Sequence, residues 1–369
     1  MSTNSGRKLA PDLARGFMLL LIALAHANQY LVHLEETALN RVIIFLRQIV
    51  VDGRAFPVFF LLFGYGMVQL LRRLEEKGQE WPAIRKLLLR RGWWLLLFGF
   101  VHTITLYDIT IGLYGLATLA FFWFLRLSDK TLIWIAGITL FLATVLGAEI
   151  TRGEYDWDHA ASTTDAAGDG IGNFLLTRAF YFVPYTLILL HQVIPAMALG
   201  IWAARKKLLD DPERHRALLL RTASIGLTLS VLGGMPLALM SSLYWHDPSA
   251  AARSLASALH TLTGYAGGIG WAALIGYITG RPSTVRGKLT VAVAALGQRS
   301  LTFFILQSIV FFIVFADGLG GVGEIGNQLG SDIVAWLTWI ASLIMAWFMQ
   351  RANVSGPAEQ LLRRLAYRK

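Results

Sequence analysis

Two ionisable side chains in the first apolar segment have types and a spacing that suit chemistry inside a membrane. Arg15 and His26 are eleven residues apart, about three helical turns and about 16 Å along the axis, so both fall on one helix face. A guanidinium binds phosphate through paired hydrogen bonds, and a neutral imidazole accepts a proton or carries an acyl group. The pair predicts a site that holds a phosphate-bearing head at the inner membrane surface and acts on its reactive group beyond the midplane. The alternative is that Arg15 marks the cytoplasmic side and His26 hydrogen-bonds a neighbouring helix.

Further polar side chains interrupt the other apolar segments, where an ionisable group is costly and is a functional candidate. We expect them to line the same cavity, although hydrogen bonding between helices would also explain each one singly. The expected catalytic partners of His26 are His102 and Asp108, and the expected phosphate ligands beside Arg15 are Arg90, Arg91 and Arg299. The expected substrate-binding residues are His33, Arg54, Arg178, Tyr181, Tyr185, His191, Gln307 and Ser308. We also expect Asp52 and Arg54 to satisfy each other near the outer surface.

Composition excludes several chemistries. The chain has no cysteine, so it has no disulfide, thiolate nucleophile or Cys-ligated zinc. No histidine or carboxylate cluster has metal-ligand spacing, so no metal site is expected. His159, His215 and His246 are expected to be ordinary loop residues.

The candidate residues must be positioned by membrane-spanning helices. The 369 residues are 55% hydrophobic and 15% charged, well below the charge content of about 25% in soluble domains. A span needs about 20 mostly apolar residues. Such runs occur near 13–32, 54–71, 92–107, 109–126, 131–150, 175–203, 217–242, 256–280, 300–316 and 333–350. We predict an all-α, polytopic membrane protein with about ten spans in one domain, 1–369, ending in a basic cytoplasmic tail, 351–369.

The charge distribution tests this topology, because cytoplasmic loops are enriched in lysine and arginine. With ten alternating helices, every basic cluster falls on one side, and the long loops on the other side are mainly acidic. The clusters are near 7–8, 72–77, 85–91, 126–130, 205–221, 281–288 and 351–369. Both termini are therefore expected in the cytoplasm, and the net charge of +10 reflects topology, which argues against nucleic acid as a partner. The first segment lacks a cleavage pattern and is expected to stay in the mature protein.

Several connecting segments carry their own expectations. The acidic, Gly- and Ala-rich 151–174 is expected to be a mobile outer loop, and 289–298 is too short to span and is expected at the inner surface. The Gly-rich 318–330 lacks the lysine and the strand–helix context of a phosphate loop. Gly264 and Gly268 form a G-x-x-x-G motif that permits close helix packing, most simply within the chain itself.

Several motifs together resemble a known family. Pro11-Asp12-Leu-Ala-Arg15-Gly16-Phe is similar to the D-x-x-R-G start of transmembrane acyltransferases. Other stretches resemble the YeiB-like family of bacterial membrane proteins along nearly the whole chain. They are Arg54 to Gly66, Gly99-Phe-Val-His102 with Asp108 and Tyr114-Gly115, Leu301-Thr302 with Gln307-Ser308, and Gly356 to Arg363. Tyr107 stands where that family usually has a glycine before the aspartate.

The resemblance implies a place in the superfamily that includes the acyltransferase-three enzymes and the heparan-glucosaminide acetyltransferase. Acyltransferase-three members carry an arginine, ten intervening residues and a histidine on the first helix, and Arg15 and His26 fit that spacing. YeiB-like members commonly have asparagine at the position of His26. At this position the sequence therefore differs from that family and matches the acyltransferase-three enzymes.

The activity so implied is transfer of an acyl group, such as acetyl, from cytoplasmic acyl-CoA to an acceptor at the outer face of the bacterial inner membrane. The co-substrate would be acyl-CoA, the surroundings membrane lipids, and a homodimer is compatible with the sequence. The alternative is a transporter in which the same polar groups form a permeation route or proton relay. A scaffold protein poorly explains so many ionisable groups at membrane depth.

Overall fold

The computed structural model describes residues 9–31, 37–106, 108–162, 170–280, 287–316, 319–321, 323 and 326–367, and these contain helices and no β-strand. The α-helices are α1 (Leu9–Ala27), α2 (Ala38–Val50), α3 (Ala55–Glu75), α4 (Trp81–Leu106), α5 (Thr110–Phe121), α6 (Asp129–Ser162), α7 (Gly170–Arg205), α8 (Arg216–Ser241), α9 (Ala250–Thr279), α10 (Lys288–Gln298), α11 (Ser300–Phe315), α13 (Gln328–Arg351) and α14 (Pro357–Tyr367). Two 3-10 turns follow α1 and α5, η1 (Asn28–Tyr30) and η2 (Phe122–Arg126).

The structure agrees with an all-α membrane protein, but it does not confirm about ten spans. Among the described residues, seven helices are long and apolar enough to cross a membrane, or eight if the bent pair α10–α11 is one span. The expected span 109–126 forms only the 12-residue α5 and η2. The expected span 256–280 lies in α9, which is long enough at 30 residues but is not among the seven.

Helix ends differ from hydropathy boundaries because a helix can continue after its apolar stretch stops. The helix α4 begins at Trp81, eleven residues before the expected 92. The expected loop 151–174 is mostly helical, because α6 runs to Ser162 and α7 begins at Gly170.

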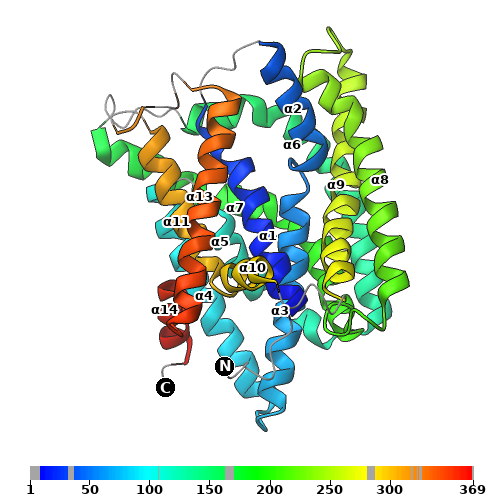
Figure 1. Ribbon diagram of the computed structural model, residues 1–369, viewed down its shortest axis with the longest axis vertical. Coiled ribbons are helices and arrows are strands. Elements are labelled where there is room, and N and C mark those ends of the chain that lie inside the picture. Colours follow the sequence, from blue (N-terminus) through cyan, green and yellow to red (C-terminus); the bar gives the residue numbers. More distant parts are fainter. Residues whose placement is uncertain are drawn as a thin grey trace.

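The helix α1 lies inside the bundle and is crossed by α10 (Figure 1). The crossing is so close that a Cβ on Gly16 would lie 2.0 Å from the carbonyl oxygen of Val293. A Cβ on Gly297 would lie 1.8 Å from the carbonyl oxygen of Asp12. The segment 289–298 is mostly buried against α1 and α13 at the Arg15 end of α1, and its place at the inner surface of the membrane stays a prediction.

Basic side chains tie the helix ends together at one end of the bundle. Arg72 of α3 pairs with Asp210 at 3.4 Å and donates to the carbonyl of Ala204 at 3.0 Å. Arg205 of α7 pairs with Asp129 of α6 at 2.9 Å. The start of α1 and the helix α14 lie toward this same end (Figure 1). These helix ends therefore agree with the prediction that the basic clusters lie on one side of the membrane.

Two helical segments are broken. Between α2 and α3, residues 51–54 form a turn in which Gly53 has a φ of +73°, a conformation open mainly to glycine. The helices α10 and α11 meet at Arg299 with a bend of 85°. The G-x-x-x-G of α9 packs against the first break: a Cβ on Gly264 would lie 2.5 Å from the carbonyl oxygen of Gly53. This motif therefore serves packing within the chain.

Candidate functional site

Arg15 is held at one end of the central helix by its own neighbours. Its Nη1 pairs with Oδ1 of Asp12, one turn earlier, at 3.3 Å. Its Nη2 donates to the carbonyl of Leu62 on α3 at 3.4 Å, and a Cβ on Gly66 would lie 2.7 Å from this Nη2. The D-x-x-R-G motif thus orients the guanidinium through Asp12 and allows α10 to cross at Gly16.

His26 meets Asp108 at the other end of α1. The His26 Nδ1 lies 3.2 Å from Oδ2 of Asp108, in the short connection between α4 and α5. The other carboxylate oxygen, Oδ1, accepts a hydrogen bond from the backbone N–H of Thr110 at 2.8 Å. A carboxylate on Nδ1 orients the imidazole, leaves Nε2 to accept a proton and stabilises the imidazolium that forms.

His102 lies beside the same aspartate but contacts its backbone. The His102 Nδ1 is 2.9 Å from the carbonyl oxygen of Asp108, which Thr103 Oγ1 also donates to at 2.9 Å. Because a carbonyl oxygen only accepts, the Nδ1 of His102 carries the proton. Its Nε2 is buried and has no hydrogen-bond partner in the described part of the chain. The structure thus brings His26, His102 and Asp108 together.

Phe304 of α11 joins the two imidazoles. Its ring centroid lies 5.8 Å from that of His26 and 5.6 Å from that of His102. One turn along α11, Gln307 donates to the carbonyl of Leu19 at 3.3 Å, and its Oε1 is buried without a partner among the described residues. Ser308 bonds back to its own helix at the carbonyl of Phe304. Gln307 therefore keeps an acceptor at the α1–α11 contact.

The polar residues of α7 divide. Arg178 is buried and donates to the carbonyl of Thr105 at 3.3 Å. The charges of Arg178 and Asp108 both interact electrostatically with the Tyr30 hydroxyl. Tyr181 is 39% exposed and packs on Phe180. Tyr185 lies half-buried against the core, and His191 bonds to the carbonyl of Ile188 on its own helix. The contact of Arg178 thus reaches the end of α4, next to Asp108.

The four arginines expected to bind phosphate also have different surroundings. The charges of Arg15 and Arg73 both act on Arg91, so positive charge gathers at this end of α1. Arg90 donates to the carbonyl of Leu365 in α14 at 3.5 Å. Arg299 is buried and its guanidinium bonds Gln350 and the carbonyls of Ala295 and Val354. Arg299 holds the α13–α14 connection.

Two cavities lie elsewhere in the molecule. One, of about 370 Å³, lies between α11, α13 and the start of α14, and the other, of about 610 Å³, is lined by residues 176, 177 and 179–181 of α7. Neither is lined by Arg15 or His26. A tunnel that joins these two side chains stays a prediction.

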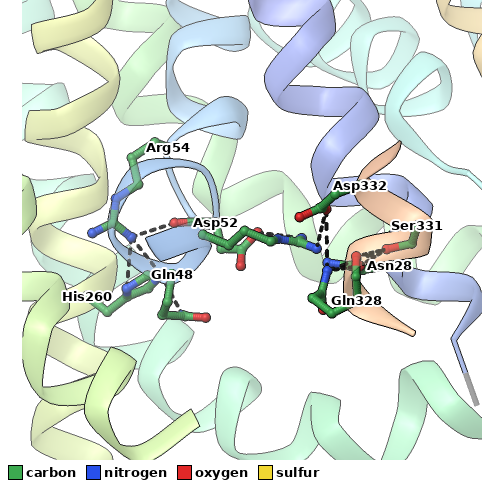
Figure 2. Close-up of polar contacts among 9 residues, drawn as sticks. Asn28, Gln48, Asp52, Arg54, His260, Gln328, Ser331 and Asp332 are labelled. Carbon is green, nitrogen blue, oxygen red and sulfur yellow. Dashed lines mark hydrogen bonds and ion pairs between the residues drawn. The ribbon is translucent and has the colours of Figure 1, made fainter. Parts of the chain in front are cut away.

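Arg54 belongs to a second polar cluster, at the break between α2 and α3 (Figure 2). Its guanidinium is fully buried and donates to Ser230 Oγ at 2.9 Å and to the Ser230 carbonyl at 2.8 Å. Its Nη1 donates to the carbonyl of Asp52 and lies 2.9 Å from Nδ1 of His260, whose other ring nitrogen is 3.4 Å from Gln48. The expected Asp52–Arg54 contact exists, but through the backbone. The carboxylate of Asp52 pairs with Arg47 at 3.1 Å.

Replacing Arg54 with methionine should lower the stability of the protein. A buried carbonyl left without a donor costs about 1–3 kcal/mol, and the carbonyl of Asp52 would lose the Arg54 donor. Ser230 would also lose two hydrogen bonds from the guanidinium. We expect a clear drop in the thermal unfolding midpoint in detergent. Arg221→Met, at an exposed position of α8, is the control. Equal midpoints for the two variants would contradict this role.

The sequence missed several members of these clusters. His260 belongs to no motif, and Arg47 lies between the expected spans 13–32 and 54–71, where an arginine is not a functional candidate by itself. Asp332, Gln328 and Asn28 are ordinary polar residues near helix ends. A search for ionisable residues just inside each span end would have found His260 and Asp332, but their partners are distant in sequence. His33 lies outside the described residues.

Comparison with known proteins now places part of the chain. Residues 203–369 match the family described as "Protein of unknown function (DUF418)". This is the YeiB-like family. The matched part includes Arg299, Gln307 and Ser308 and lies outside the His26–Asp108 region.

One curated relative is the "Uncharacterized protein YxaH" of Bacillus subtilis (strain 168). It is 27% identical over 213 residues, covering 49% of this chain and 50% of that protein. The chain thus spans about half the length of the curated relative that it matches. No solved structure matches.

Proposed function

We propose that this protein is a membrane-embedded acyltransferase that moves an acyl group from cytoplasmic acyl-CoA to an acceptor at the outer face of the bacterial inner membrane. The observation that carries the proposal is the pairing of His26 with Asp108 at 3.2 Å on the helix that carries Arg15. A carboxylate-bound imidazole at membrane depth is suited to proton transfer at a group that reaches it from the inner surface.

Arg15, Arg73 and Arg91 provide positive charge for the phosphates of CoA at the start of α1, toward the end of the bundle that holds α14 (Figure 1). The thioester would then extend toward His26, about 16 Å along the helix. A series of aromatic rings lies between Arg15 and His26. The Tyr114 hydroxyl interacts with the charge of Arg15. The ring centroid of Tyr114 lies 4.8 Å from that of Phe59, which lies 6.2 Å from that of Phe304. Phe304 then contacts His26.

In the transfer step, Nε2 of His26 takes the proton from the acceptor hydroxyl or amine. The acceptor oxygen or nitrogen forms a bond to the thioester carbonyl carbon, the carbon–sulfur bond breaks, and the sulfur leaves as a thiolate that takes the proton from the imidazolium. In the alternative order, Nε2 attacks the carbonyl carbon and the carbon–sulfur bond breaks to release the thiolate. The acceptor then attacks the acyl carbon, the bond from this carbon to Nε2 breaks, and the freed Nε2 takes the acceptor's proton and passes it to the thiolate. Asp108 stabilises the positive imidazole in both orders.

Replacing Arg15 with glutamine should weaken acyl-CoA binding. Loss of a phosphate-binding guanidinium removes charge-assisted hydrogen bonds worth about 1.5–3 kcal/mol, so the Kd for labelled acetyl-CoA should rise by about tenfold or more. Arg214→Gln, at an exposed position of the loop before α8, is the matched control. The proposal fails if purified protein in detergent binds no acetyl-CoA, or if both variants bind it as the parent does.

The broken helices favour a transporter as the second candidate. Discontinuous helices near the middle of the membrane form many transport sites, and this chain has breaks at 51–54 and at Arg299. Solute uptake by proteoliposomes in the absence of any acyl donor would support the transporter and count against the transferase.

A further inference from the structure

A polar network links three separate parts of the bundle next to His26. It consists of Asn28, Arg47, Asp52, Gln328, Ser331 and Asp332, and we refer to it as the outer network. Arg47 of α2 pairs with Asp52 at 3.1 Å and with Asp332 of α13 at 3.3 Å. Gln328 donates to Asp332 at 3.4 Å and to Asn28 Oδ1, and Ser331 also donates to Asn28 (Figure 2). The network therefore connects η1, the α2–α3 break and the first turn of α13.

The outer network lies on one side of His26 along the helix axis. Asn28 is two residues beyond His26 in η1, and Gln328 to Asp332 form the start of α13. Both lie away from the end of the bundle that holds α14 and the start of α1 (Figure 1). The positive-inside rule assigns this opposite side to the outer face of the membrane. An acceptor that approaches His26 along the α1 axis from this side would meet these residues first.

The outer network differs from the Arg54 cluster in how completely its charges are satisfied. Arg54 is 0% exposed and its guanidinium nitrogens all have partners, with glycines of α8 and α9 packed around it. In the outer network, the side chain of Asp52 is 30% exposed and that of Asp332 is 15% exposed. The Nε of Arg47 has no hydrogen-bond partner in the described residues. Arg47 is itself only 8% exposed, so water enters this network first at the two partly exposed carboxylates, whereas the fully enclosed Arg54 contacts resist exchange.

The backbone beside the network can bend. Asp52 precedes Gly53, whose φ of +73° marks the turn between α2 and α3, and α13 begins at Gln328 after the Asn327 cap. Helix ends and turns of this kind absorb hinge motions. Separation of Arg47 from Asp332 would therefore let α2 move relative to α13 while the Arg54 cluster keeps α3 in place.

We propose that Arg47, with Asp52 and Asp332, forms an ionic gate that closes the outer side of the His26 site. The closed form is the one described here. Opening breaks the Arg47–Asp332 pair and the Asn28–Gln328 contact. Molecules on the outer side of the membrane, away from α14, then reach His26. The gate serves the proposed transferase as the acceptor entrance, but it stands on its own contacts and would serve a transporter equally.

The absence of cysteine from the chain allows a direct test. Ala25 is a half-buried residue next to His26 in the chain, and we replace it with a single cysteine. A membrane-impermeant maleimide is added to the outside of intact cells, and the rate at which it labels this cysteine measures how easily an outside molecule reaches the His26 region. Labelling of Ala25→Cys alone should be slow. Adding Arg47→Gln or Asp332→Asn should speed it by about tenfold or more, which corresponds to about 1.4 kcal/mol of gate closure.

The controls separate opening from general effects. Arg253→Gln removes one exposed positive charge from α9 near the same face, and labelling in that background should match Ala25→Cys alone. Asp332→Asn keeps the shape and an acceptor for Gln328, so it is the variant least prone to misfold, and gel filtration checks each protein. Unchanged labelling in both gate variants, or equal acceleration by Arg253→Gln, would overturn the gate. This result is independent of acetyl-CoA binding and leaves the proposed transferase to its own test.

Discussion

Transfer from labelled acetyl-CoA should fall by about 10²–10⁴-fold when His26 is replaced with alanine, the range expected for loss of a general base. The Nδ1 of His26 faces the Asp108 carboxylate, so the imidazole is oriented to use Nε2. Asp108→Asn should also lower the rate, because an amide does not stabilise the imidazolium as a carboxylate does. Acetyl-CoA binding should be nearly unchanged in both variants, since the charged groups near Arg15 remain.

His246→Ala is the control, because His246 is exposed in the loop before α9. Acid quenching during turnover separates the two possible orders of transfer. Label retained on the parent protein, and absent from His26→Ala, identifies the acyl carrier. A transfer rate in His26→Ala equal to that of the parent would exclude both orders.

Gly297→Val should strongly destabilise the protein. The new Cβ would lie 1.8 Å from the carbonyl oxygen of Asp12 and 2.7 Å from the backbone nitrogen of Gly16, and backbone atoms of a central helix cannot move aside easily. Overpacking typically costs about 1–3 kcal/mol and sometimes more, so the thermal unfolding midpoint in detergent should drop by several degrees. Because Asp12 pairs with Arg15, any folded Gly297→Val protein should also bind acetyl-CoA less tightly.

Gly137→Ala gives the matched control. Gly137 lies in α6, and a Cβ there meets nothing within 4 Å. Alanine in a helix is favoured over glycine by up to about 1 kcal/mol, so this variant should be as stable as the parent or slightly more so. A midpoint for Gly297→Val that matches that of Gly137→Ala would show that the α1–α10 crossing is less tight than described.

The sequence predicted the local features well where one segment contained the whole signal. Arg15 and His26 belong to one helix, so their spacing alone placed them on one face. The spans near 13–32, 54–71, 175–203, 217–242 and 333–350 became helices with similar bounds, because long apolar runs have few other structures inside a membrane. The count of about ten spans is not confirmed: in the described part of the chain seven or eight helices are long and apolar enough to cross a membrane, and short segments such as α5 lack that length.

Contacts between distant segments were harder to predict. The motifs around His102 and Asp108 suggested a shared site with His26, and the structure brings the three together through the turn between α4 and α5. Arg299 followed the same reasoning, yet its guanidinium serves the α13–α14 connection. Arg15 and Arg299 both lie at the ends of apolar segments. The neighbouring sequence does not distinguish a guanidinium that faces a ligand from one that binds backbone carbonyls.

By itself, the sequence determined an all-helical chain, apolar enough for a membrane, with its basic residues toward one side and an arginine and a histidine aligned on the first helix. These properties follow from composition and from the period of the helix. Only the tertiary structure decided which groups meet: Asp108 with His26, Arg54 with His260, and Arg47 with both Asp52 and Asp332. Such pairs join residues up to 285 positions apart, and their partners are chosen by helix packing, which glycines such as Gly16 and Gly297 permit.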